Sequence, residues 1–106
     1  MVHWPGDGDG DALRRLEEHG LDFSVPHVVE FNVDFHEWPP SKAALSALQQ
    51  RFESLESYPP SEGLAGYVLL RVRGMVSYDW VTSVQREVTA VVGAYGGVCE
   101  SWGLLH

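Results

Sequence analysis

The sequence predicts an α+β fold in which helices cover one face of a single sheet, and three observations lead to this prediction. The chain has 106 residues, the length of one domain. Two segments alternate apolar and polar side chains with a period of two, as half-buried strands do. Two other segments carry apolar stripes at helical spacing. The chain therefore has the pattern of one domain that combines helices and strands.

The N-terminal region predicts a flexible segment followed by a short helix. Residues 1–10 are rich in glycine and aspartate, and we expect residues 1–8 to form a flexible acidic segment. Asp9 or Asp11 is a suitable N-cap for a helix over residues 11–19, because acids near a helix start favour its dipole. Gly20 suits the position just after the helix. Residues 9–106 then form the single folded domain.

The first strand is predicted over residues 28–35, where side chains alternate strictly. The apolar face consists of Val29, Phe31, Val33 and Phe35. The polar face consists of Glu30, Asn32 and Asp34. One face should pack on the core while the other remains polar.

A second helix and a short strand follow. Pro39 and Pro40 end the first strand, and Ser41 is a suitable N-cap. The apolar stripe of the predicted helix contains Ala44, Leu45, Leu48, Phe52 and Leu55. Residues 56–58 predict a short strand, which the prolines at 59–60 confine to a sheet edge.

The last part of the chain predicts a strand, a helix and a final strand. Residues 67–73 alternate, with an apolar face of Val68, Leu70 and Val72 opposite Tyr67, Leu69, Arg71 and Arg73. Ser77 is a suitable cap for the third helix. The stripe of that helix contains Val81, Val84, Val88, Val91, Val92 and Tyr95. Two glycines at 96–97 end the helix, and residues 98–104 predict the last strand.

The order of these elements predicts a ferredoxin-like sandwich (βαββαβ) with an extra N-terminal helix. Two strand–helix–strand units with right-handed crossovers place both of their helices on one face of the sheet. In this arrangement the first and third strands are central neighbours. Glu30, Asn32 and Asp34 should then lie near Arg71 and Arg73, on a polar face with Tyr67 and Trp102 as aromatic anchors.

Charge restricts the class of partner. The formal net charge is −8, and residues 1–37 alone contain nine acids and two bases. Such a surface repels nucleic-acid phosphates and anionic membranes, so we expect neither as a direct partner. A basic protein is the complementary partner. The lone Cys99, the lack of a signal sequence and the lack of a long apolar run predict a cytoplasmic location.

No pattern of catalytic or metal-binding residues stands out. The run from Asp7 to Asp11 resembles the start of a calcium loop, but Ala12 occupies the position where that loop needs glycine. The five histidines lack the spacing of zinc ligands. Neither a nucleophile elbow nor a phosphate-binding glycine loop occurs. We therefore expect a protein that is not an enzyme, with no catalytic residue, metal or cofactor.

Several short motifs, in order, resemble the RraB family, the regulators of ribonuclease E activity of type B. They are the acidic segment 9–20, the Asp22-Phe23-Ser24-Val25-Pro26 turn, and the ending that contains Gly96-Gly97, Glu100 and Trp102-Gly103. The resemblance covers roughly residues 9–105. Family members often have Asp-Gly where this chain has Glu100-Ser101. The resemblance implies a ferredoxin-like fold and a regulator that inhibits ribonuclease E.

The leading hypothesis is a non-catalytic regulator that docks an acidic surface on a basic RNA-processing enzyme, ribonuclease E or another basic nuclease. The candidate partner-binding residues are Asp9, Asp11, Glu17, Glu18, Asp22, Glu30, Asp34 and Trp102, with Asp7 beside them. One alternative is an immunity or antitoxin-like protein that neutralises a basic nuclease. Another is a structural domain that forms a homodimer through its polar sheet face.

Overall fold

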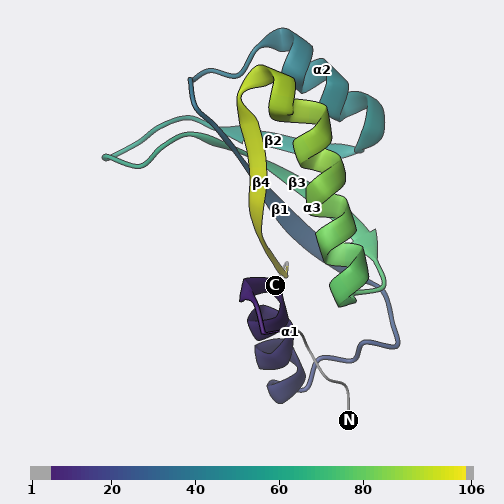
Figure 1. The fold of residues 1–106 in the computed structure, drawn as a ribbon. Helices are drawn as coiled ribbons and strands as arrows, with labels where there is room; N and C mark the ends of the chain where they lie inside the picture. The colour runs from purple at the N-terminus through teal and green to yellow at the C-terminus, as the bar shows by residue number, and fades with distance from the viewer. Residues whose placement is uncertain (1–5, 105–106) are drawn as a thin grey trace.

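The computed structural model describes residues 6–104, with the backbone alone at Glu100. This part of the chain contains three α-helices, one 3-10 turn and four strands, and Figure 1 shows how they are arranged. In chain order they are α1 (Gly8–Glu18), β1 (His27–Phe35), α2 (Lys42–Arg51), β2 (Ser54–Tyr58), β3 (Tyr67–Gly74), α3 (Tyr78–Val92), η1 (Gly93–Tyr95) and β4 (Gly97–Leu104). The protein is therefore a mixed α+β fold.

The four strands form one sheet in the order β2-β3-β1-β4, and every neighbouring pair is antiparallel. The prediction that the first and third strands are central neighbours is confirmed. Helices α2 and α3 pack on one face of this sheet, while α1 lies at one end, near the end of β4 (Figure 1). We call the face beneath α2 and α3 the covered face, and the opposite one the open face.

The core lies on the covered face, where alternate residues of β1 meet those of β3. Val29 and Val33 are fully buried and pair in register with Val72 and Val68. Phe31, also fully buried, contacts Trp80 of α3 edge to face, with ring centroids 5.8 Å apart and an interplanar angle of 72°. Full burial of each such side chain contributes about 1.5–3 kcal/mol. The apolar residues of the alternating sequence thus form the surface of β1 that packs against the helices.

Helix α1 begins three residues earlier than predicted. Its N-cap is Asp7, whose carboxylate accepts a hydrogen bond from the Gly10 backbone N–H at 2.8 Å. The prediction of Asp9 or Asp11 as the cap is wrong, because Asp7 is the extended residue from which the helix starts. Of the predicted flexible segment 1–8, residues 1–5 lie outside the described residues.

The other two caps are confirmed, but both helices end sooner than predicted. Ser41 accepts from the Ala44 N–H and Ser77 from the Trp80 N–H. Helix α2 ends at Arg51, so Leu55 belongs to β2, which begins at Ser54 instead of residue 56. The predicted helical stripe ran on into β2 because Phe52 and Leu55 both pack on the core. Helical spacing alone does not show where a helix ends and a core-facing strand begins.

The end of α3 shows a similar error. The helix stops at Val92, and Tyr95 lies in η1 with 43% of its surface exposed, so it does not extend the buried stripe. Gly96 follows with a φ of 77°, in the left-handed region that glycine tolerates. Among the described helices, none combines the length and apolar character that crossing a membrane would require.

Candidate functional site

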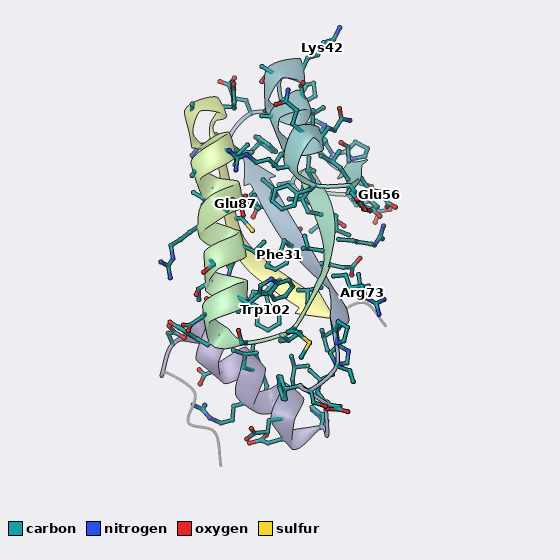
Figure 2. All side chains as sticks on the ribbon, turned by 90° about the vertical axis from the view of Figure 1, so that its right-hand side faces the viewer. Phe31, Lys42, Glu56, Arg73, Glu87 and Trp102 are labelled. Carbon is teal, nitrogen blue, oxygen red and sulfur yellow. The ribbon has the colours of Figure 1, made fainter. Side chains whose placement is uncertain are left out.

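The open face is the first candidate surface, because none of the described helices covers it. Residues paired across neighbouring strands project from the same face, so the register defines its members. They are Ser54, Glu56 and Tyr58 of β2; Tyr67, Leu69, Arg71 and Arg73 of β3; Val28, Glu30, Asn32 and Asp34 of β1; and Val98, Ser101 and Gly103 of β4. Figure 2 shows Glu56 and Arg73 on the side away from α3. The predicted polar face is therefore present.

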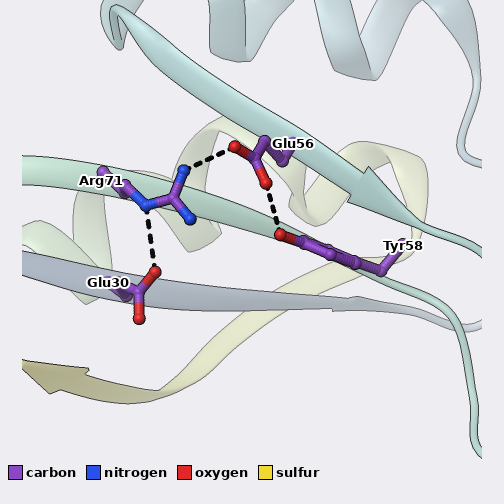
Figure 3. A network of polar contacts seen from close by, with 4 residues as sticks. All are labelled: Glu30, Glu56, Tyr58 and Arg71. Atoms are coloured by element: carbon purple, nitrogen blue, oxygen red, sulfur yellow. Dashed lines mark hydrogen bonds and ion pairs between the residues drawn. The ribbon is translucent and has the colours of Figure 1, made fainter. Parts of the chain in front are cut away.

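A charged network occupies the middle of the open face (Figure 3). Arg71 Nε lies 3.0 Å from Glu30 Oε2, and Arg71 Nη1 lies 2.6 Å from Glu56 Oε1. The Tyr58 hydroxyl donates to the second oxygen of Glu56. The Arg71 and Glu30 side chains are only 27% and 24% exposed. The predicted proximity of Glu30 and Arg71 is confirmed, and the edge strand adds a second carboxylate.

The hydrogen bonds of this network shift the pKa of its members. The hydrogen bond from Tyr58, followed by the contact with Arg71, lowers the pKa of Glu56. The same hydrogen bond raises the pKa of Tyr58. Contact with Glu56, ahead of Glu30, raises the pKa of Arg71. Arg71 thus remains charged between two carboxylates, and the three charged groups carry a net charge of −1.

An aromatic pair and an acid lie at one end of the open face. The rings of Tyr58 and Tyr67 stack with centroids 5.0 Å apart and an interplanar angle of 17°. Asp34 is paired with Tyr67 in register and is exposed. It accepts a hydrogen bond of 3.1 Å from the Asn32 side chain. Tyr67 therefore lies on the polar face, as predicted.

Trp102 does not lie on the open face, contrary to the prediction. It pairs in register with Phe31, on the covered face, and Figure 2 shows the two side chains next to each other near α3. The register of β4 shifts between the partners of Asn32 and Val33. Such a bulge adds a residue and reverses the alternation. Trp102 and Cys99, three residues apart, consequently both pack on the core.

The indole of Trp102 is held by an acid of α1. Asp9 Oδ1 accepts hydrogen bonds from Trp102 Nε1 at 2.8 Å and from Gln85 Nε2 at 3.2 Å. Gln85 is buried in α3, so Asp9 connects α1 to both α3 and β4. A shallow cavity of about 310 Å³ opens beside these groups, lined by Gly8, Asp9, Ala12, Ser101 and Trp102. Asp9 therefore has a structural role that sequence reasoning did not find.

Several other N-terminal acids also have intramolecular partners. The Tyr78 hydroxyl donates to Asp7 at 2.6 Å and, together with the Gly10 N–H, lowers the pKa of Asp7. Asp11 pairs with Arg14 at 2.6 Å. Hydrogen bonds from Ser24, side chain first, lower the pKa of Asp22.

Two acids of α1 differ from the acids described above. The side chains of Glu17 and Glu18 make no hydrogen bond or ion pair within the described part of the chain, although the Glu17 carbonyl accepts from the Gly20 backbone N–H. Glu18 is exposed and Glu17 is half-buried.

The calcium-like run has a different arrangement from a metal loop. Asp7 caps α1, Asp9 binds the indole, and Asp11 pairs with an arginine. Across residues 6–104, the His, Cys, Asp and Glu side chains described form no group of three or more suited to a metal ion. Cys99 is buried within β4, with 5% of its surface exposed.

Comparison with known proteins identifies the family. A search of curated proteins finds no match to this chain. The model of the RraB family, described as "Regulator of ribonuclease activity B", matches residues 7–104. The matched region contains α1, with its N-cap, and all four strands. This chain therefore belongs to the RraB family of regulators of ribonuclease activity.

Proposed function

We propose that this protein is a non-catalytic regulator that inhibits ribonuclease E by binding to it in the cytoplasm. The observation that carries the proposal is the family match over residues 7–104. We also class the fold as a ferredoxin-like sandwich with an added N-terminal helix. The sheet order β2-β3-β1-β4 and the two strand–helix–strand units support that class.

The docking surface that we propose includes the exposed side of α1 and the turn that follows it. The side chains of Glu17 and Glu18 have no competing partner among the described residues, and Asp11 and Asp22 are exposed. An acidic surface of this kind attracts a basic region of an enzyme and accelerates association. Asp9 and Trp102 contribute by fixing α1 to α3 and β4, so that the acids are presented from a rigid helix.

The proposal is tested by calorimetry and an RNA-cleavage assay with purified ribonuclease E. We expect binding and slower cleavage, both weakened as the salt concentration rises. The variant Glu17→Lys/Glu18→Lys should associate about tenfold more slowly, because charge reversal removes electrostatic steering. The control Glu53→Lys/Glu62→Lys makes the same charge change at exposed positions outside α1.

Two results would count against this proposal. Lack of binding by the unmodified protein would contradict ribonuclease E as the target. An equal effect of both double variants would show that overall charge, and not the surface of α1, controls association. Binding to a different basic nuclease would retain the regulator class and replace the target.

A further inference from the structure

We propose that the open face holds an arginine side chain of the protein partner between the Tyr67 ring and the Asp34 carboxylate, beside Val98. This inference rests on the proposed protein-binding function and names a contact chemistry and a surface apart from α1. We call these three residues the arginine seat.

The register places the seat in a single row across the sheet. Asp34 of β1 pairs with Tyr67 of β3 on one side and with Val98 of β4 on the other. Tyr58 of β2 pairs with Tyr67 and completes the row. Directly paired residues project from the same face, and neighbouring strands lie about 4.8 Å apart. The three groups of the seat are therefore adjacent.

The stacking of the two tyrosines fixes the orientation of the Tyr67 ring. The centroid separation of 5.0 Å is close to the spacing between strands, and the rings are within 17° of parallel. Each ring therefore presents its faces to the neighbouring strands. Tyr58 covers one face of Tyr67, and the other face is directed toward β1, where Asp34 stands. The Asp34 side chain is short and exposed to solvent.

The carboxylate in the seat lacks a cation. Within the described residues, the one hydrogen bond to the Asp34 side chain comes from the neutral amide of Asn32. Arg71, four residues beyond Tyr67 in β3, is engaged by Glu30 and Glu56. Arg73 lies toward the far end of β3, opposite Val28. The negative charge of Asp34 is therefore available to a positively charged group from outside.

A guanidinium group matches this combination better than other ligands. It is planar, stacks on an aromatic ring, and donates hydrogen bonds to a carboxylate in a fixed geometry. The aliphatic stem of arginine can lie on apolar surface such as Val98. Nucleic acid is disfavoured, because the open face has three acids, Glu30, Asp34 and Glu56, against two arginines. Charge complementarity thus selects an arginine-bearing protein segment.

The test is a titration of the whole isotopically labelled protein by NMR with the peptide acetyl-Gly-Arg-Gly-amide. We expect saturable shifts of the Asp34, Tyr67 and Val98 amides, and weaker shifts with the lysine peptide of the same design. The glutamine peptide should leave them unchanged. Asp34→Asn and Tyr67→Leu should each weaken the apparent affinity roughly fivefold. Glu53→Gln removes the same charge at an exposed position outside both α1 and the seat, and should leave the shifts intact.

Four outcomes would overturn the inference. The first is the absence of shifts in this row, and the second is equal weakening by Asp34→Asn and Glu53→Gln. The third is movement of the row on dilution of the protein alone, which would assign the face to a second copy. The fourth is movement of the row by a single-stranded RNA oligonucleotide but not by the arginine peptide. Asp34→Asn keeps the test valid if Tyr67→Leu fails to fold. The titration contains no ribonuclease, so its failure is distinct from a failure of ribonuclease E binding.

Discussion

The two faces of the sheet are built from the same strands but differ in what their side chains do. On the covered face, β1 and β3 contribute Phe31 and Leu70, which are fully buried. On the open face, the same strands contribute Glu30 and Arg71, joined by an ion pair. Alternation along one strand therefore places core side chains and charged side chains of the open face at adjacent positions. Substitutions on the covered face should alter the free energy of unfolding, while those on the open face should chiefly alter binding.

The largest difference between the faces is expected at adjacent residues of β1. Phe31→Ala should lower the free energy of unfolding by about 3–5 kcal/mol, because it leaves a cavity beside Trp80. Its neighbour Asn32 faces the other way, and Asn32→Ala should stay within about 0.5 kcal/mol. Urea denaturation of the two variants measures this contrast. Similar losses of unfolding free energy in both variants would contradict it.

Two glycines of β4 offer the next comparison. A Cβ at Gly97 would lie 2.8 Å from Phe35 and Val92 on the covered face, whereas one at Gly103 would meet no atom within 4 Å. Gly97→Ala should therefore cost about 1–3 kcal/mol through overpacking. Gly103→Ala on the open face should be neutral or slightly stabilising. Thermal unfolding compares them, and an equally destabilised Gly103 variant would contradict the description of the open face.

The attachment of α1 to the covered side can be broken at Asp9. Asp9→Ala leaves Trp102 Nε1 without its acceptor and removes one of the two acceptors of the buried Gln85 amide, which should cost about 1–3 kcal/mol. Hydrogen exchange should increase throughout α1. The control Asp11→Ala removes an exposed ion pair with Arg14 and should change stability by less than about 1 kcal/mol. Unchanged exchange in the Asp9 variant would show that α1 is held by other contacts.

The smallest effect is expected from titration of the network on the open face. Because the pKa of Glu56 is lowered by folding, its contribution is present above the ordinary carboxyl range of about 4 and is lost as the pH falls through the lower folded-state value. The pKa of Tyr58 is raised, so its contribution is present below about 10 and is lost as the pH rises through the folded-state value.

Melting temperatures measured across both pH ranges check this prediction. Glu56→Gln should flatten the decline at acidic pH in part, since Asp7 and Asp22 also have lowered pKa values. The exposed Glu62 provides a control, because it does not belong to the network of Glu30, Arg71, Glu56 and Tyr58 in Figure 3. If Glu62→Gln flattened the profile equally, general charge repulsion would explain the acid sensitivity.

The sequence by itself determined the features that depend on near neighbours in the chain. Strict alternation located β1 and β3 and assigned Glu30 and Arg71 to the same face. Ser41 and Ser77 were identified as caps because a cap bonds to a backbone group three residues away. The short motifs between residues 9 and 105 led to the RraB family. All of these signals are carried by local spacing.

Only the tertiary structure decided the features that depend on how distant segments meet. The bulge in β4 turned Trp102 into the core, although simple alternation gives no sign of it. Asp9 became the acceptor for a side chain 93 positions away. The register of β2 brought Glu56 to Arg71 and Tyr58 to Tyr67. Strand register and helix docking are set by packing over the whole molecule, so local spacing does not encode them.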